Sequence, residues 1–135
     1  MSFNVIGVDG AVSLASSKNC ANIIHLNLES NMIREEGIYA IVMSENLANL
    51  EHLDLKSNGI GNSGIQSISI GLIKKLKFLN VQHNNISDDG YRIISESMNF
   101  QQLKDLKIYD GNQASTEAKN AIKRSNNLQA LRFIN

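Results

Sequence analysis

A repeat of 26 to 27 residues is the feature that most constrains how this chain can fold. The stretch 25–31, which reads His-Leu-Asn-Leu-Glu-Ser-Asn, returns with the same alternation at 52–58 and at 78–84. The leucines that open the pattern are 27 residues apart (Leu26 to Leu53) and then 26 apart. Further copies begin near residues 105 and 130, so one supersecondary unit repeats through nearly the whole chain.

The second half of each unit is periodic too. After the asparagine that ends the stretch, an isoleucine, a glycine and another isoleucine follow at constant intervals. They are Ile33, Gly37 and Ile41 in one unit, and Ile60, Gly64, Ile68 and Ile86, Gly90, Ile94 in the next two. The pattern predicts a single domain over 1–135, with a partial first repeat over 1–22, repeats starting near 23, 50, 76 and 103, and a terminal strand over 128–135.

Each unit combines the two periodicities of regular structure. Leu26 and Leu28 alternate with Asn27 and Glu29, which predicts a strand whose leucines point into the core while the polar pair faces solvent. The stretch 37–47 carries apolar residues at helical spacing. A strand, a returning helix and a parallel strand make a right-handed crossover, and stacked units share one core that a lone unit could not bury.

The pattern resembles leucine-rich repeats, specifically the ribonuclease-inhibitor-like class with its long helical half. That resemblance implies an α/β right-handed solenoid, a horseshoe with a parallel sheet on the concave face and helices on the convex face. The inhibitor itself is rich in cysteine and this chain has one, Cys20, so the resemblance is to the class and not to that protein.

One column of asparagines closes the strand of each unit. In the family, such side chains bond backbone groups of the turn and of the neighbouring repeat. A buried amide there can satisfy backbone groups that no strand reaches, so the role expected of these residues is structural. The predicted column is Asn4, Asn31, Asn58 and Asn84.

The two ends depart from the regular pattern. In the fourth unit Gly111 stands at the asparagine position, with Asn112 one residue later, which suits a terminal capping repeat. At the other end Met1 falls where a strand leucine belongs, so the chain opens inside a repeat. We expect a fragment of a longer solenoid or a first repeat covered by something else, and self-association through that edge is a further expectation.

Gly59, Gly61 and Gly64 spell G-x-G-x-x-G between a predicted strand and a predicted helix, as in dinucleotide-binding proteins. However, Gly64 is the repeat glycine, and the acidic residue expected about 20 positions further on is missing.

His25 and His52 share a strand column and could meet at a metal ion, but no third ligand is defined.

Two further motifs have plain structural interpretations. Asp88 and Asp89 resemble part of a calcium loop but more simply begin a helix, with Ser87 as its cap. Cys20 falls on a core column, where a thiol acts as a small apolar side chain. We therefore expect no cofactor, no bound metal and no catalytic residues.

The net charge and the cysteine count indicate which classes of partner and which compartment to expect. Thirteen basic and thirteen acidic residues give a net charge of zero, whereas nucleic-acid-binding and membrane-surface proteins usually carry a basic excess. A lone cysteine fits a reducing compartment, so we expect a cytoplasmic protein, or one delivered into a host cytosol if it is a secreted effector.

Function is expected where the repeat leaves positions free, on the outward side chains of the strands. The first column contains His25, His52 and Phe78; the second Asn27, Asp54, Asn80, Lys107 and Arg132; the third Glu29, Lys56, Gln82 and Tyr109. Phe78 and Tyr109 are candidate anchors, because aromatic residues dominate the energetics of many interfaces. The sequence thus predicts a non-catalytic protein-interaction scaffold that binds a partner on the concave face, or alternatively a regulator of an enzyme, such as a GTPase activator or an enzyme inhibitor.

Overall fold

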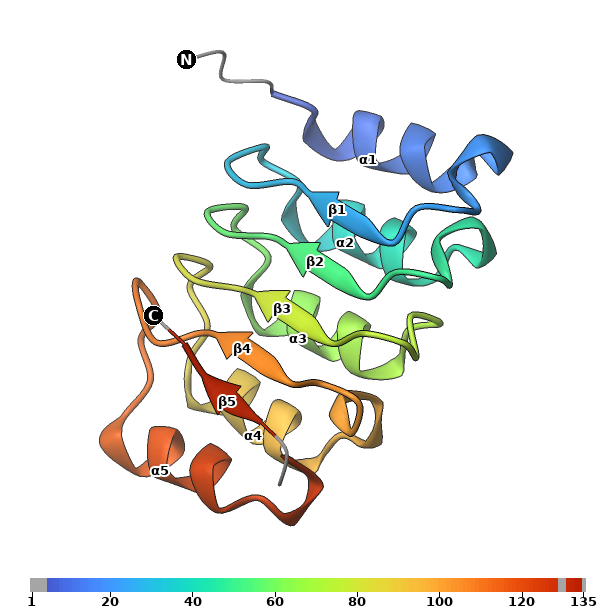
Figure 1. Ribbon diagram of the computed structural model, residues 1–135. Helices are drawn as coiled ribbons and strands as arrows, with labels where there is room; N and C mark the ends of the chain where they lie inside the picture. Colours follow the sequence, from blue (N-terminus) through green and yellow to red (C-terminus); the bar gives the residue numbers. More distant parts are fainter. Residues whose placement is uncertain (1–4, 129–130, 135) are drawn as a thin grey trace.

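The computed structural model describes residues 5–128 and 131–134 as a stack of helix–strand units (Figure 1). The helices are α1 (Gly7–Ser16), α2 (Arg34–Val42), α3 (Gly61–Ile70), α4 (Asp88–Glu96) and α5 (Thr116–Arg124). The strands are β1 (His25–Asn27), β2 (His52–Asp54), β3 (Phe78–Asn80), β4 (Asp105–Lys107) and β5 (Arg132–Phe133). Short 3₁₀ turns precede four of the strands: η1 (Lys18–Cys20), η2 (Glu45–Leu47), η3 (Met98–Phe100) and η4 (Asn126–Leu128).

The strands form one parallel sheet in the order β1-β2-β3-β4-β5. His25 pairs with His52, His52 with Phe78, and Phe78 with Asp105, so the predicted columns are in register across the first four strands. The helices lie behind the sheet as a second layer (Figure 1). The predicted α/β solenoid of leucine-rich repeats is confirmed.

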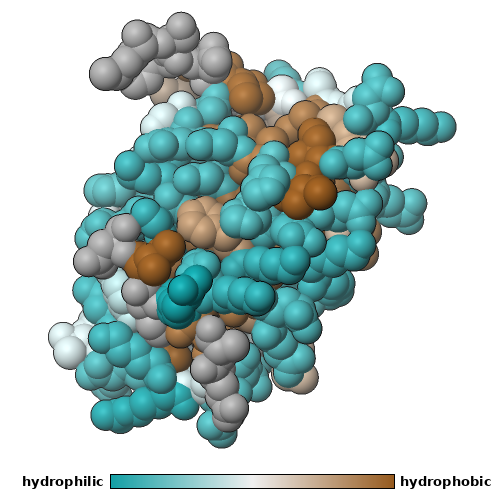
Figure 2. All heavy atoms as spheres, viewed as in Figure 1, coloured by the Kyte–Doolittle hydropathy of each residue, from teal (hydrophilic) through white to brown (hydrophobic). Residues whose placement is uncertain are grey.

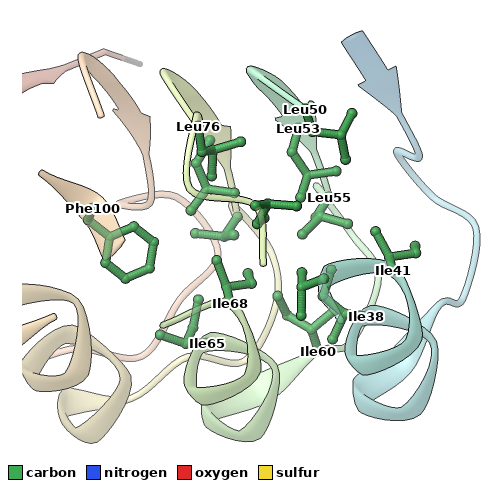
Figure 3. Packing of buried hydrophobic residues seen from close by; sticks show 14 of the residues in the cluster. Ile38, Ile41, Leu50, Leu53, Leu55, Ile60, Ile65, Ile68, Leu76 and Phe100 are labelled. Atoms are coloured by element: carbon green, nitrogen blue, oxygen red, sulfur yellow. The ribbon is translucent and has the colours of Figure 1, made fainter. Parts of the chain in front are cut away.

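The core lies between the two layers. Leu53 and Leu55, which alternate with polar residues along the second strand segment, are fully buried against helix residues such as Ile38, Ile41 and Ile65 (Figure 3). Equivalent side chains of successive repeats join into one continuous apolar cluster. Each repeat therefore buries its apolar face only by contacting its neighbours, as the solenoid interpretation requires.

The helical half of each repeat differs from the single helix expected over 37–47. Helix α2 ends at Val42, and Ser44 is extended before the separate turn η2. The Ser44 hydroxyl and the Asn46 amide both donate to the carbonyl of Ala15, at 2.5 Å and 3.1 Å, near the carboxyl end of the preceding helix. They satisfy a carbonyl that the end of a helix would otherwise leave unpaired.

This Ser-x-Asn motif recurs and was not identified from the sequence. Ser97 and Asn99 donate to Ser69 and Gly71, while Ser125 and Asn127 donate to Ser95 and Glu96 of the repeat before them. In the repeat that starts near residue 50, Ile70 and Leu72 replace the serine and the asparagine, and both are exposed, at 55% and 38%. There the backbone amide of Leu72 donates to Val42 at 2.7 Å instead.

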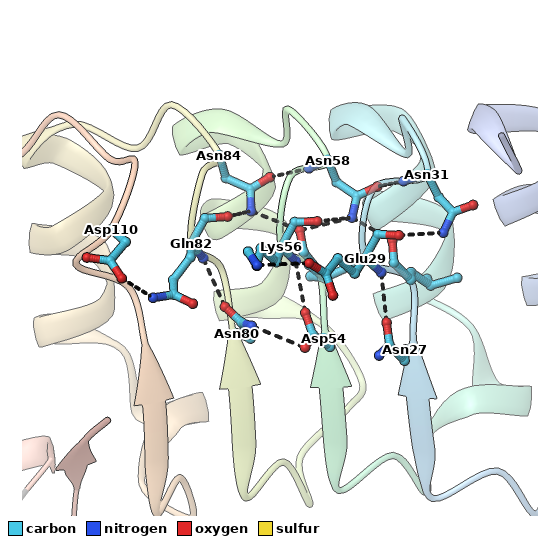
Figure 4. Close-up of polar contacts among 12 residues, drawn as sticks. Asn27, Glu29, Asn31, Asp54, Lys56, Asn58, Asn80, Gln82, Asn84 and Asp110 are labelled. Atoms are coloured by element: carbon cyan, nitrogen blue, oxygen red, sulfur yellow. Dashed lines mark hydrogen bonds and ion pairs between the residues drawn. The ribbon is translucent and has the colours of Figure 1, made fainter. Parts of the chain in front are cut away.

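A ladder of asparagines joins the repeats at the carboxyl ends of the strands (Figure 4). The Asn58 side-chain oxygen accepts from the amides of Asn31 and Ile33, both at 3.1 Å. Its side-chain nitrogen donates to Leu28 of the preceding repeat at 2.7 Å and to Leu55 at 2.9 Å. Asn84 repeats these bonds one unit further on, and Asn31 accepts from the amide of Ile6. Asn31, Asn58 and Asn84 thus bond backbone groups of the turns and of neighbouring repeats, as expected for this column; Asn4 lies outside the described residues.

The asparagine ladder continues in the fourth repeat, where the sequence has Gly111 at the expected asparagine position. Asn112 accepts from the amides of Asn84 and Ile86, and it donates to Val81 and Ile108. The fourth repeat therefore keeps its asparagine and has one additional residue before it.

Replacing Asn58 with alanine should lower the free energy of unfolding by about 1–3 kcal/mol, because buried backbone groups lose their partners. Asn126, which is exposed and has no side-chain hydrogen bond among the described residues, is the matched control. Urea unfolding followed by circular dichroism measures both variants. Equal stability of Asn58→Ala and Asn126→Ala would contradict the structural role.

Gly64 should not tolerate a methyl group. A Cβ atom at this position in α3 would lie 2.5 Å from Ile60 Cβ and 3.2 Å from Ile38 Cγ2 of the preceding repeat. Overpacking of this kind costs about 1–3 kcal/mol, so Gly64→Ala should lower the urea midpoint. Ser63→Ala, at the exposed neighbouring position of the same helix, should leave it nearly unchanged.

Arg34 adopts a backbone conformation that its counterparts reach with glycine. Its φ is +56°, while Gly7 and Gly61 have φ of +65° and +58°, and all three amides donate to the backbone oxygen of a ladder asparagine. Left-handed backbone costs a residue with a side chain about 1–2 kcal/mol, partly offset by the entropy that glycine loses on folding. Arg34→Gly should therefore raise the thermal midpoint, whereas Arg92→Gly inside α4 should lower it.

Candidate interaction surface

The outward side chains of the strands form the sheet face, on which the sequence analysis placed the binding residues. Figure 2 shows this face as mostly hydrophilic atoms with hydrophobic ones among them. The three columns differ in the contacts, hydrogen bonds and ion pairs that their side chains make.

The first column is a stack of rings. The imidazole rings of His25 and His52 have centroids 4.3 Å apart, and His52 and the Phe78 ring are stacked with centroids 5.4 Å apart. His25 is exposed, and the other two are half-buried. The parallel register places these rings side by side on adjacent strands, so they form an aromatic platform that crosses three repeats.

The second column mainly holds the turn that follows each strand. Side-chain oxygens of Asn27, Asp54 and Asn80 each accept from the amide two residues further on, at 2.9 to 3.1 Å. Asn80 also donates to Asp54 at 3.1 Å (Figure 4). The exposure expected for Asn80 is wrong: it is only 4% exposed, because neighbouring side chains cover it. Asn27 is exposed, and Asp54 and Lys107 are half-buried.

The third column is a set of contacts between repeats. Lys56 forms an ion pair with Glu29 at 2.9 Å, and hydrogen bonding to that carboxylate raises the pKa of the Lys56 ammonium. Gln82 donates to Asp110 at 2.8 Å and is 6% exposed, so the exposure expected for Gln82 is also wrong. Exposed ion pairs of this kind contribute little to stability.

The place predicted for Tyr109 is wrong because the fourth repeat contains an additional residue. The carbonyl of Asp110 accepts from the amide of His83, as that of Gln82 accepts from Ser57, so Asp110 occupies the third column. Tyr109 instead packs against the core, with its ring centroid 6.5 Å from that of Tyr91. Burial raises the pKa of both phenols.

Arg132 also lies elsewhere than predicted. It pairs with Asp105, so it stands in the first column rather than the second, and the expected alignment of the last strand is displaced by two residues. Its guanidinium binds the Asp105 carboxylate at 2.9 Å, which closes the first column beyond Phe78 with an ion pair.

The glycine motif, Ser87 and Cys20, which the sequence singled out, have the following places in the structure. Gly59 lies in the turn and Gly61 is the first residue of α3, both with positive φ, while Gly64 packs inside α3. Ser87 precedes α4, but its hydroxyl accepts from the Asn62 amide instead of capping the helix. Cys20 is buried as expected.

Metal ligands are not gathered within residues 5–128 and 131–134. No group of three or more histidine, cysteine, aspartate or glutamate side chains there could hold a metal ion. His25 and His52 stack on each other, and their nearest ring neighbour along the column is Phe78 rather than another ligand.

Across the same described residues, none of the helices combines the length and the apolar character needed to cross a membrane. No curated protein matches the chain at a significant level.

Comparison with known families agrees with the geometry. The Leucine Rich repeat family matches residues 19–42, 46–69 and 73–91, three segments that follow one another at the period of the solenoid. The first two segments span β1 with α2 and β2 with nearly all of α3, and the third spans β3 and the beginning of α4. Repeats of this family are generally protein-interaction modules. With its repeat sequence, its parallel sheet and its asparagine ladder, the chain belongs to the leucine-rich repeat family.

Proposed function

We propose that the protein is a non-catalytic scaffold that binds a partner protein on its sheet face, through the platform formed by His25, His52 and Phe78. The observation that carries this proposal is the contrast between the platform and its surroundings. Most polar side chains of the second and third columns are bonded to one another or to the turns, whereas the three rings contact mainly each other.

The chemistry of the platform favours an apolar or aromatic side chain on the partner. Stacked rings offer a flat surface for further stacking, worth about 0.5–1.5 kcal/mol per aromatic pair beyond the area buried. On one side the platform is bordered by the ion pair of Lys77 with Glu51 at 2.7 Å, which lowers the pKa of the Glu51 carboxyl. Beyond it lies the ion pair of Arg132 with Asp105. An apolar centre with a charged border is the arrangement of a typical protein interface.

The remaining sheet-face residues surround this centre. Exposed Asn27 and Glu29 and half-buried Asp54, Lys56 and Lys107 can supply polar contacts at the rim. Asn80 and Gln82 are buried and donate to Asp54 and Asp110, so they do not belong to the contact surface in this proposal.

Affinity capture with the intact chain, followed by calorimetry with the purified captured protein, tests the platform. Phe78→Ala should weaken binding at least tenfold, since truncating an aromatic anchor at an interface centre commonly costs about 2 kcal/mol or more. Gln66→Ala, on the exposed side of α3, should leave the affinity unchanged. Urea midpoints of both variants show whether the fold is retained.

The reverse result would place the partner on the helices. If Phe78→Ala and His52→Ala bind with the affinity of the unchanged chain while Gln66→Ala does not, the sheet face is not the binding surface.

A further inference from the structure

Apolar residues at the N-terminal end of the solenoid, around α1 and β1, are less covered than their counterparts in later repeats. Ile6 is 37% exposed, whereas its counterparts Ile33, Ile60 and Ile86 are at most 1% exposed. The same holds in three more core columns: Leu14, Ile23 and Leu26 are only half-buried, and the equivalent residues of the next three repeats are completely covered. Ile24, beside β1, is 45% exposed. These five residues form what we call the end face.

Polar groups on the end face match those that bind a preceding repeat elsewhere in the chain. Ser17 and Asn19 repeat the Ser-x-Asn motif, one repeat length before Ser44 and Asn46. Ser44 and Asn46 donate to the end of the preceding helix. Among the described residues, the side chains of Ser17 and Asn19 have no hydrogen-bond partner, although Ser17 is half-buried.

The backbone of β1 shows the same one-sided pattern. The amide of His52 donates to the carbonyl of Ile24 in the repeat before it, at 3.0 Å, and that of Phe78 donates to Glu51 at 3.0 Å. Asp105 and Arg132 make the equivalent bonds in β4 and β5. His25 is their counterpart in the edge strand, so its amide faces the open side of the sheet.

The opposite end of the molecule does not complement the end face. Helix α5 buries a single residue, Ile122, and exposes Glu117, Lys123 and Arg124. Figure 2 likewise shows hydrophobic atoms near the N-terminal end and mostly hydrophilic atoms at the lower end of the view. Stacking one copy on another end to end would therefore press apolar side chains against charged ones.

We propose that the end face is a docking surface for another leucine-rich-repeat unit. In this arrangement the strand of the docked unit lies parallel to β1 and accepts from the amide of His25. The carboxyl end of its helix accepts from Ser17 and Asn19, while its apolar residues cover Ile6, Leu14 and Leu26. The surface continues the interface that already joins each repeat to the one before it, with the same columns and the same donors.

A direct test adds such a unit to the full chain. A copy of residues 32–54 is joined ahead of Met1, which lies two repeat lengths before Leu55 and therefore keeps the register. The expected result is at least tenfold slower hydrogen exchange of the His25 amide, together with a higher urea midpoint. Ser17→Ala with Asn19→Ala should lower that midpoint in the extended chain and leave it unchanged in the original chain.

Two controls distinguish a fitted interface from unspecific stabilisation. Ser44→Ala with Asn46→Ala should lower the midpoint equally in both chains, because those residues have their partner in either case. A second probe, a copy of residues 59–80, guards against failure of one particular sequence. If both added units exchange as unfolded chain, or if His25 is not protected, the proposal is overturned.

Light scattering of the original chain provides an independent check. In place of the self-association expected from the sequence, a monomer is now expected, because the charged α5 end does not complement the end face. A dimer that Leu26→Asp disrupts would show that the occupant is a second copy and would overturn the proposal.

Discussion

The structure depends on satisfying backbone groups where each strand ends. At these turns the chain leaves the sheet through residues with positive φ, such as Ser30 and Ser57. Amides that follow, such as those of Asn31 and Ile33, bond to a side chain instead of to a strand. Asn58, Asn84 and Asn112 each accept two of these amides and donate to carbonyls of their own and the preceding repeat. Since an unpaired buried backbone group is costly, the asparagines fix where each repeat turns and hold successive turns together.

That constraint also shapes the sheet face. With the turns fixed, the strands pair in register, and residues of one column stand beside each other in adjacent repeats. The second column then serves the turn, through an oxygen that accepts from the amide two residues on. Lys107 cannot accept such a bond, and it is in this repeat that the turn contains an additional residue. In the proposed function, recognition falls to the first column, whose first three side chains are rings.

The period of the sequence was sufficient to predict the fold, the register of the first four strands and the asparagine ladder. These features rest on apolar and amide side chains that recur at a fixed interval, so each repeat confirms the others. The prediction was wrong where a repeat changes length. Tyr109 was placed by counting from Leu106, and the count does not show where an additional residue bulges. Arg132 was placed by taking Leu131 as the strand leucine, whereas Phe133 is the residue that pairs with Leu106.

Other properties of the surface depend on three-dimensional neighbours and cannot be obtained by counting. Asn80 and Gln82 have the alternation of exposed residues, yet Asp54, Asp110 and adjacent side chains cover them. The Ser-x-Asn motif is visible in the sequence once its partners are known. It was missed because serine and asparagine outside a strand are also the ordinary residues of loops.

The loss of that motif in the repeat that starts near residue 50 has a consequence for how the molecule unfolds. In a linear array, the coupling between adjacent units determines where a stretch of units separates from the rest. Where the repeat that starts near residue 50 meets the one before it, a single backbone bond from Leu72 to Val42 stands in for the serine and asparagine bonds found at the other described junctions. Of the described junctions, this one therefore has the fewest bonds of this kind. We expect the solenoid to open there first, and the platform of His25, His52 and Phe78 spans that boundary.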